Sequence, residues 1–566
     1  MATRRSEKTP AAKKPAAKKQ TAKPAAKKAA PLRPSVRAAV ERTAQSADDM
    51  AAQAFGLPPA AKKAAAKKAA AKKAAAKKPA ARKPAAKKAA APQRRATAPV
   101  AAASRTPLPI QKHLALETRV AAGKTQRTAV PLEALGAWEP KPDRADPVAI
   151  ITAQETDRLQ PLLPVRHARM LQNAFGFYRG APAVMSADLA AGPRTDLEVQ
   201  LCGDAHLLNF GLYGSPERSL VFDVNDFDET LPGPFEWDVK RLVASLVVAA
   251  RGNGFGRKKA RAIALASARS YRDFMRRFAE MDTLTTWYTQ MNADKILDGI
   301  HDPVLRADAE RTATRATSRD AAQAAAKLTV VQDGRRTIVP QPPLVVPFRD
   351  LPEGLDIVDL NRSVRMNWTT YRHSLHSDVI RLLSRYRLED LALKVVGVGS
   401  VGTRCFIGVF TGRDADDVLF LQVKEAGRSV LEPHLKRSRY KHQGERVVAG
   451  QRLTQSASDI FLGWSNGPQG GTFYWRQLRD WKGSVNVGTM DPAHLTAYGE
   501  LCAWTLAKGH ARSGDPAAIA AYLGKKDRFD IAMADFAEAY AAQNEADYAA
   551  MQKAAEDGRI EVAEVF

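Results

Sequence analysis

The chain has little cysteine, no long apolar run and almost no acidic residues in its first hundred positions. Its three cysteines, Cys202, Cys405 and Cys502, lie far apart and show no CxxC spacing. This pattern argues against a disulfide framework or a zinc knuckle and is typical of a reducing cytosol. The longest strongly apolar run, residues 242–250, is too short to span a membrane. Because the basic N-terminus also lacks the apolar segment of a secretory signal, we expect a cytoplasmic protein without a membrane partner.

The scarcity of acidic residues locates the charge of the chain. Residues 1–100 hold 27 lysines and arginines against 4 aspartates and glutamates, a net charge of +23, whereas the other 466 residues carry only +4. Residues 1–105 repeat short Lys/Ala/Pro units with few large apolar side chains. Such an arm cannot bury enough surface to offset its chain entropy, so we expect it to be disordered.

The lysine pairs of this arm recur every five residues over much of its length, so on a helix they would advance by about 140° and collect on no single face. The repeats resemble the tails of linker histones and of bacterial histone-like proteins. That resemblance implies binding of DNA or RNA through phosphates, without sequence readout, and a nucleoid-associated place in the cytoplasm. A flexible tail that only keeps the protein soluble is the alternative.

The rest of the chain predicts an α+β body. Apolar periodicity predicts helices in most of residues 106–388, and a change to short apolar runs broken by Gly and Asp predicts three antiparallel strands from residue 389. The expected helices cover residues 153–190 (two helices), 235–255, about 258–295, about 303–327, about 366–386, about 436–457, about 492–511, 515–523 and 527–556. We read the proline-rich residues 338–354 as a linker or surface loop. The expected parts are the arm (1–105), a mainly helical lobe (106–388), a β-rich lobe (389–490) and C-terminal helices that complete the helical lobe (491–566).

Two polar motifs follow predicted strands. Residues 203–209 read Gly-Asp-Ala-His-Leu-Leu-Asn, and residues 225–228 read Asn-Asp-Phe-Asp. Gly, Asp and Asn end strands in many proteins, so turn chemistry alone is one interpretation. A metal–phosphate site is the other, and the choice depends on the rest of the chain.

A possible partner for these motifs lies two hundred residues later. Gly397, Gly399 and Gly402 form a Gly-x-Gly-x-x-Gly pattern that is followed by a predicted strand, not by the helix of a dinucleotide-binding fold. A glycine-rich hairpin between strands is what kinases place over nucleotide phosphates. Lys424 at the end of the next apolar strand would hold those phosphates, and Glu445 on the following predicted helix would orient the lysine. Glu425 is nearer in sequence but less suitably placed.

No catalytic loop follows Lys424, and the earlier motifs supply one. Residues 203–209 match the Gly-Asp-x-His-x-x-Asn loop of aminoglycoside-phosphotransferase-like kinases, and residues 225–228 match their metal-binding Asp segment. From about residue 155 onward the chain also resembles the bacterial family called domain of unknown function 2252. That resemblance is carried by residues 177–180, 202–211, 222–230, 237–246, 396–405, 422–426, 450–464 and 510–515.

The family name assigns no activity, but the motif order implies a fold. We expect a protein-kinase-like, two-lobe fold in which the catalytic segment precedes the nucleotide-binding lobe, which is a circular permutation. ATP and Mg²⁺ are the expected cofactors. The acceptor is open.

The resemblance assigns roles to the polar residues. Asp204 would accept the proton of an attacking hydroxyl. Asn209 and Asp226 would hold Mg²⁺, with Asp228 available for a second ion. His206 would brace the loop by hydrogen bonding, because a single histidine among carboxylates does not indicate zinc.

Three further residues have weaker assignments. Asp238 is expected to brace the catalytic loop, and Asp223 to be a polar residue at a strand end. Arg179 is expected to form a structural salt bridge, and an anion contact is the alternative. Asp228, where protein kinases have a glycine, and the inverted order of the lobes leave two other functions open: an inactive nucleotide-binding scaffold, or a metal-dependent hydrolase or nuclease that uses the aspartates.

Overall fold

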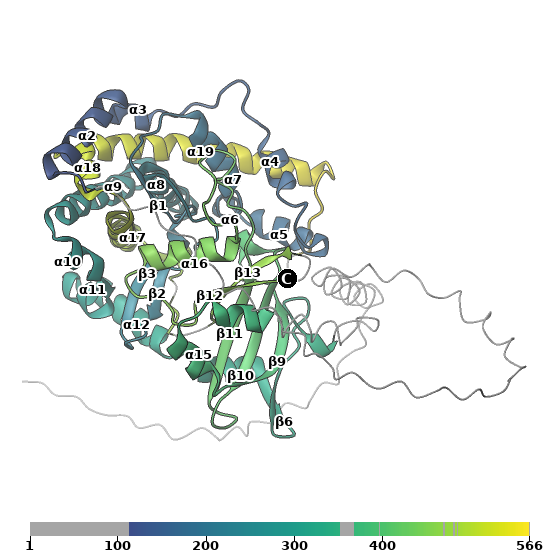
Figure 1. Ribbon diagram of the computed structural model, residues 1–566. Helices are drawn as coiled ribbons and strands as arrows, with labels where there is room; N and C mark the ends of the chain where they lie inside the picture. The colour runs from purple at the N-terminus through teal and green to yellow at the C-terminus, as the bar shows by residue number, and fades with distance from the viewer. Residues whose placement is uncertain are drawn as a thin grey trace, which may run out of the picture. The chain divides into compact units, whose positions relative to one another are not determined.

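The computed structural model describes residues 113–350, 367–395, 397–467, 470–478, 481–483 and 485–564. The predicted basic arm, residues 1–105, lies outside these ranges. Within them the chain has a mixed α+β structure that is mostly helical, with antiparallel sheets (Figure 1). No helix of the described ranges is both long and apolar enough to cross a membrane.

Helices lie both before and after the two polar motifs. Those that precede the first motif are α2 (Leu116–Ala129), α3 (Leu132–Gly136), α4 (Pro147–Ala153), α5 (Leu163–Met170), α6 (Ala174–Gly180) and α7 (Pro182–Ala191). Those that follow the second are α8 (Phe235–Gly252), α9 (Arg257–Glu280), α10 (Thr283–Tyr288), α11 (Ala293–Gly299), α12 (Pro303–Thr317), α13 (Ala321–Leu328) and α15 (Ser377–Leu383). The chain continues with α16 (Gln443–Thr454), α17 (Pro492–Ser513), α18 (Pro516–Leu523) and α19 (Arg528–Glu556).

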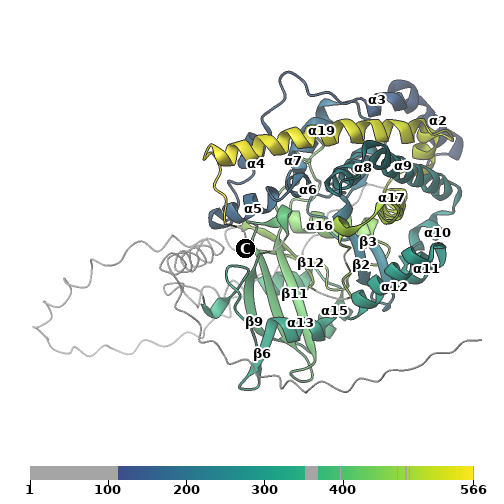
Figure 2. The same ribbon diagram turned by 180° about the vertical axis from the view of Figure 1, so that it is seen from behind.

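Helix α8 lies at the centre of the main hydrophobic core. All its residues from Phe235 to Ala250 are buried, and α9, α17 and α19 pack against it (Figures 1 and 2). Acidic residues in its first turn, Glu236 and Asp238, suit the positive end of the helix dipole. The helix predicted at residues 235–255 is thereby confirmed.

A six-stranded antiparallel sheet forms the β-rich part, with strand order β12-β13-β11-β10-β9-β8. Its strands are β8 (Val345–Pro347), β9 (Arg387–Lys394), β10 (Cys405–Thr411), β11 (Val418–Glu425), β12 (Gly463–Asn466) and β13 (Thr472–Gln477). Lys424 on β11 lies opposite Cys405 of β10 and Tyr474 of β13. Helix α16 packs on both this sheet and α17, so it connects the sheet to the helical part.

Short strands frame the polar motifs. They are β1 (Glu198–Leu201), β2 (Phe210–Gly214), β3 (Leu220–Val224), β4 (Leu231–Pro234) and β5 (Met291–Asn292), and a separate hairpin is formed by β6 (Thr329–Gln332) and β7 (Arg335–Ile338). Strand β1 pairs with β4, and β2 pairs with β3. The Gly-Asp-x-His-x-x-Asn loop therefore leaves β1 and enters β2, and the Asp segment joins β3 to β4.

Several predictions about the elements are wrong. The two helices expected at 153–190 are replaced by three, α5, α6 and α7, and the helix expected at about 303–327 is divided into α12 and α13. The single helix expected at about 258–295 is divided because Asp282 and Asn292 each accept a backbone N–H and begin new helices, α10 and α11. The proline-rich passage is not only a loop, because β8 within it pairs with β9 at the edge of the sheet. The prolines obscured this strand in the sequence, although an edge position tolerates Pro347. The β-rich part thus draws on residues ahead of position 389.

Candidate active site

The first polar motif forms a tight turn whose backbone is held by α8. The Asp238 carboxylate accepts hydrogen bonds from the backbone N–H groups of Cys202 (2.8 Å) and Gly203 (3.0 Å). Gly203 has φ +84°, and a Cβ there would lie 2.3 Å from the carbonyl oxygen of Glu229. Only glycine fits this position. The bracing role expected for Asp238 is therefore what the structure shows.

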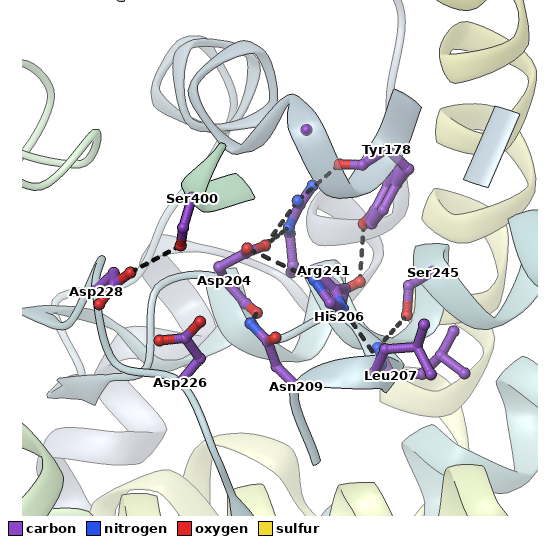
Figure 3. Close-up of polar contacts among 12 residues, drawn as sticks. Tyr178, Asp204, His206, Leu207, Asn209, Asp226, Asp228, Arg241, Ser245 and Ser400 are labelled. Carbon is purple, nitrogen blue, oxygen red and sulfur yellow. Dashed lines mark hydrogen bonds and ion pairs between the residues drawn. The ribbon is translucent and has the colours of Figure 1, made fainter. Parts of the chain in front are cut away.

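Asp204 follows this glycine and faces a small cavity. Its carboxylate lies 2.7 Å from Nη2 and 2.8 Å from Nε of Arg241, and the side chain is 16% exposed. Its backbone oxygen accepts hydrogen bonds from Asn209 Nδ2 (2.6 Å) and from the N–H of His206 (2.8 Å) (Figure 3). The loop is thus fixed from both ends, and the carboxylate is aligned by an arginine one helical turn beyond Asp238.

His206 is buried and acts within the loop. Its Nδ1 accepts the N–H of Leu208 at 3.2 Å, so this nitrogen carries no proton. Its Nε2 lies 3.7 Å from Asp204 Oδ2. Burial lowers the pKa of His206 to about 3, which keeps the ring neutral at physiological pH. These contacts agree with the bracing role that we expect from the sequence.

The second motif meets the β-rich part through Lys424. Its ammonium, 3% exposed, lies 2.6 Å from Asp228 Oδ2 and 3.4 Å from Asp226 Oδ1. Asp228 also accepts hydrogen bonds from the Tyr474 hydroxyl (2.6 Å) and from Ser400 Oγ (3.3 Å). Burial acts to raise the pKa of Asp228, but Lys424 and Tyr474 outweigh it and hold the pKa at about 2. The structure therefore joins residues 226–228 to a strand almost two hundred residues later.

The glycine loop, residues 397–402, lies over these aspartates. It connects β9 to β10, as the sequence predicts, and contains a single 3₁₀ turn (η4, Val398–Ser400). Gly402 has φ +90°, and its carbonyl accepts the N–H of Leu159 at 2.8 Å. Through Ser400 the loop contacts Asp228, so it closes the site.

The cavity beneath the loop measures about 40 Å³, which is room for a few water molecules. It brings Asp204, Asn209, Asp226, Asp228 and Gly399 into one space. Its full lining is Gln154, Arg158, Arg166, Gly180, Pro182, Asp204, Asn209, Asp226, Asp228, Glu229, Gly399, Ser400 and Val430. Ligand sites generally measure 300–1,000 Å³, so this space is closed to a nucleotide unless the loop moves.

The donors in this cavity suit Mg²⁺. Because Asn209 Nδ2 donates to the backbone, its Oδ1 is left for a cation, and the Asp226 carboxylate is 33% exposed. The described residues contain no group of three His, Cys, Asp or Glu side chains that could hold a metal. Mg²⁺ does not require one, since it is commonly held by one or two carboxylates together with substrate phosphates and water. Asp228, in contrast, is already occupied by Lys424, Tyr474 and Ser400.

Glu445 does not make the predicted contact. In the described part of the chain the ion pairs of Lys424 run to Asp226 and Asp228, not to Glu445. Glu445 stands in the first turn of α16, where its N–H is capped by His442. The next residue, Arg446, reaches the site instead and donates to the backbone oxygens of Asp228 (2.8 Å), Thr230 (2.7 Å) and Gly427 (2.9 Å).

Three arginines and a tyrosine that hold the site together were not among the predicted residues. Arg241 contacts the first motif, Arg446 and Tyr474 contact the second, and Arg476 donates to the Asn225 carbonyl at 2.9 Å. Arg241 lies in residues 237–246, one of the stretches that carry the family resemblance, thirteen positions after the Asp segment ends. The others stand on α16 and β13, and nothing in their local sequence marks them.

Asp223 is more than a polar residue at a strand end. It forms a buried ion pair with Lys508 of α17, whose ammonium also donates to the Thr454 carbonyl at 3.0 Å. His510, one helical turn from the end of α17, lies 3.3 Å from Asp238 and 2.8 Å from the Tyr271 hydroxyl. These contacts anchor the two motifs to the C-terminal helices.

A second, larger cavity of about 560 Å³ lies among α9, α11, α12 and α17. Its lining is mainly apolar and includes Phe222, Phe274 and Trp504. No predicted site residue lines it. The convergence of charged side chains, rather than cavity size, marks the candidate site.

The comparisons with known proteins identify a family but no characterised relative. Residues 158–554, more than half of the chain, match the family described as "Uncharacterized protein conserved in bacteria (DUF2252)". No curated protein and no solved structure matches the chain.

Proposed function

The chain belongs to the DUF2252 family, and from the geometry of its site we propose that it is an ATP- and Mg²⁺-dependent phosphotransferase. One observation carries the proposal: the Lys424 ammonium contacts both Asp226 and Asp228, which precede it by 198 and 196 residues. A kinase requires such a meeting of a strand lysine with the metal-binding segment. It also agrees with a kinase-like, two-lobe fold whose catalytic segment comes first.

The residues divide the chemistry between them. Lys424 would bind the phosphates beneath Gly397, Gly399 and Gly402, while Asn209 and Asp226 would hold Mg²⁺, which neutralises charge on the phosphate chain. The acceptor oxygen forms a bond to the γ-phosphorus as the bond to the β-phosphate oxygen breaks.

Asp204 takes the hydroxyl proton in this reaction. Its alignment by Arg241 positions the carboxylate, and its second oxygen remains available. His206 keeps the loop in shape without titrating. A role for Glu445 in orienting Lys424 stays a prediction for the nucleotide-bound form.

Nucleotide entry requires the glycine loop to move. The 40 Å³ cavity, the Ser400–Asp228 hydrogen bond and the Lys424–Asp228 ion pair describe a closed state. Phosphates that enter would replace Asp228 as a partner of Lys424. Asp228 would then be free to contact a second cation, as the sequence analysis suggests.

A catalytically inactive nucleotide-binding scaffold is the second candidate. The observation that favours it is the close double contact of Arg241 with Asp204, because a neighbouring cation weakens a carboxylate as a base. This candidate predicts stabilisation by ATP and Mg²⁺ without turnover. A metal-dependent hydrolase or nuclease would need no phosphate-binding lysine, and it remains the third interpretation.

The basic arm has a separate proposed role. Its charge of +23 over 100 residues suits non-specific binding of DNA or RNA, which would place the protein at the nucleoid. The acceptor of the phosphoryl group is a different matter, since the arm affects location more than chemistry.

The test compares Asp204→Asn and Asp226→Asn with Asp143→Asn, a matched change at an exposed residue. ADP formation is measured with ATP and Mg²⁺ over a panel of hydroxyl-bearing acceptors, and thermal melting is followed in parallel. We expect wild type and Asp143→Asn to turn over ATP, and both site variants to lose at least about a hundredfold in rate with their fold intact. Stabilisation by ATP without turnover would favour the scaffold. Cleavage of DNA or RNA without any ATP effect would favour the nuclease.

A further inference from the structure

One wall of the cavity carries arginines that are incompletely paired. Arg158 and Arg166 line the cavity; Arg158 lies in a bend between α4 and the following 3₁₀ turn, and Arg166 lies in α5. Arg179 lies beside the glycine loop, where a Cβ built on Gly397 would be 3.9 Å from its Nη2. None of the three is needed by the phosphotransferase chemistry described above.

Arg166 is 1% exposed and incompletely paired. Its Nη2 donates to the Gly180 carbonyl at 2.9 Å, and its Nε has no hydrogen-bond partner. The nearest carboxylate, Glu155, is 3.5 Å away and is shared with His167, which it contacts at 2.9 Å. Burial, and then the charge of Arg158, lower the pKa of Arg166 to about 9. A buried cation in this state is costly unless an anion joins it.

Arg158 is also incompletely paired within the described residues. Its one side-chain hydrogen bond, of 2.6 Å, goes to the Val401 carbonyl in the glycine loop, and within the described residues it forms no ion pair. Burial lowers the pKa of Arg158, and Glu229, the carboxylate that most opposes this effect, is itself only partly ionised because burial raises its pKa to about 7. The charge of Arg158 acts on Arg166, so the two guanidinium groups lie close in space, and the carboxylates that act on Arg158 do so without a direct ion pair in the described residues.

Arg179 adds a third cation at the edge. Its buried Nε has no hydrogen-bond partner, and in the described residues its side chain forms no ion pair. The carboxylate that acts on it through charge is Asp204. The structural salt bridge expected for Arg179 is therefore not formed within the described residues, and the position of Arg179 suits an anion near the catalytic aspartate.

We propose that Arg158 and Arg166, flanked by Arg179, form a second phosphate-binding subsite in the wall of this cavity. Guanidinium groups bind phosphate oxygens through paired, charge-assisted hydrogen bonds, and the free Nε–H of Arg166 is such a donor. The proposal rests on the proposed function for the ligand that carries this phosphate. That ligand is either the nucleotide, whose terminal phosphate would reach the arginines, or a phosphorylated acceptor held beside Asp204.

The experiment uses the full-length protein and inorganic tripolyphosphate without Mg²⁺, at constant ionic strength set with chloride. The melting temperature is the readout, and it is titrated in wild type, Arg158→Met and Arg166→Met. The control is Arg272→Met, because Arg272 is also buried but is fully paired with Asp530 by two hydrogen bonds of 2.9 Å. All variants keep the basic arm, so phosphate bound there affects them equally.

We expect tripolyphosphate to raise the melting temperature of wild type and of Arg272→Met with the same midpoint concentration. In Arg158→Met and Arg166→Met the midpoint should rise roughly tenfold to a hundredfold, the loss expected for a charged hydrogen-bond donor. Equal midpoints in wild type and both arginine variants would overturn the subsite. If one variant does not fold, the other gives the same comparison.

Two further arms separate the ligand sources and the two proposals. Competition between ATP and tripolyphosphate assigns the phosphate to the nucleotide, whereas additive stabilisation by ATP and a phosphorylated acceptor such as a sugar phosphate assigns it to the acceptor. Arginine-dependent stabilisation without ATP turnover would support the subsite and count against the phosphotransferase. Turnover that is unchanged in Arg158→Met, together with unchanged midpoints, would overturn the subsite alone.

Discussion

The ion pair between Lys424 and Asp228 offers the most quantitative test of how the site is assembled. Lys424→Met removes the ammonium and leaves two carboxylates, Asp226 and Asp228, near each other. Asp228→Asn removes one of them with little change in shape. Measured singly and together, these variants form a double-mutant cycle that isolates the pair.

The magnitude follows from the structure. Asp228 has an ordinary pKa of 3.8 and a folded-state pKa of about 2, and its side chain is 27% exposed. A lowering of this size corresponds to about 2 kcal/mol of stability. Because the folded pKa is lowered, this contribution is present above pH 3.8 and is lost as the pH falls toward 2. Lys424→Met alone should cost about 3–5 kcal/mol, since it breaks a buried pair and strands its partner.

The assay is urea unfolding at pH 7 and at several values between pH 5 and 2. We expect a coupling energy of about 2 kcal/mol between the two substitutions, and a shallower acid loss in Asp228→Asn. The control cycle uses the exposed pair of Lys553 and Asp557, 73% and 42% exposed, whose coupling should stay below about 0.5 kcal/mol. A coupling below about 0.5 kcal/mol for Lys424 and Asp228 would refute the ion pair as a determinant of the site.

Three other predictions test neighbouring features. The pKa of His206 falls from 6.5 to about 3 on folding, so wild type should lose stability as the pH drops from 6.5 toward 3. His206→Asn keeps an acceptor for the N–H of Leu208, and it should reduce this loss of stability when thermal melts are compared across the same pH range. Gly402→Ala should reduce stabilisation by ATP and Mg²⁺, because φ is +90° and a Cβ would lie 3.0 Å from Arg158. Gly256→Ala, whose Cβ would have no atom within 4 Å, should leave this stabilisation unchanged. Equal effects of the two substitutions would contradict the role of the glycine loop. Deletion of residues 1–105 should weaken DNA binding in filter assays and reduce its dependence on salt, and an unchanged salt slope would exclude the arm as the binding element.

The long helices and the main strands could be predicted from the sequence because their patterns are local. Helix α8 contains the longest strongly apolar run of the chain, residues 242–250. Strands β9, β10 and β11 are short apolar runs that are broken by Gly and Asp. Strand β8 could not, because its three residues gain their place only by pairing with β9. Asp282 is of a residue type that often begins a helix, but the apolar periodicity on both sides of it favours one continuous helix.

The meeting of Lys424 with Asp226 could be predicted because motif order implied a shared site. The partners of these residues could not. Arg446 and Tyr474 reach the Asp segment only through the way α16 and β13 pack against it, and no spacing rule relates them. Glu445, the predicted residue, is adjacent to Arg446, the residue that contacts the Asp segment. The order of the motifs along the chain therefore indicates the helix but not the side chain that makes the contact.

The cluster of Arg158, Arg166 and Arg179 could not be predicted from the sequence either. Nothing in the local sequence marks Arg158 and Arg166, and only their place in the cavity wall and their incomplete pairing distinguish them. Arg179 lies in residues 177–180, one of the stretches that carry the family resemblance, so the sequence indicates it as a candidate. Only the structure shows that its buried Nε has no hydrogen-bond partner.

The central claim is that Asp226 and Lys424 belong to a nucleotide–metal site, and ATP affinity with and without Mg²⁺ tests it most directly. Calorimetry on wild type and Asp226→Asn, at fixed ionic strength, gives both values. We expect Mg²⁺ to strengthen ATP binding to wild type by at least about tenfold and to have little effect in Asp226→Asn. Absence of ATP binding to wild type, or a Mg²⁺ effect that survives in Asp226→Asn, would contradict the account.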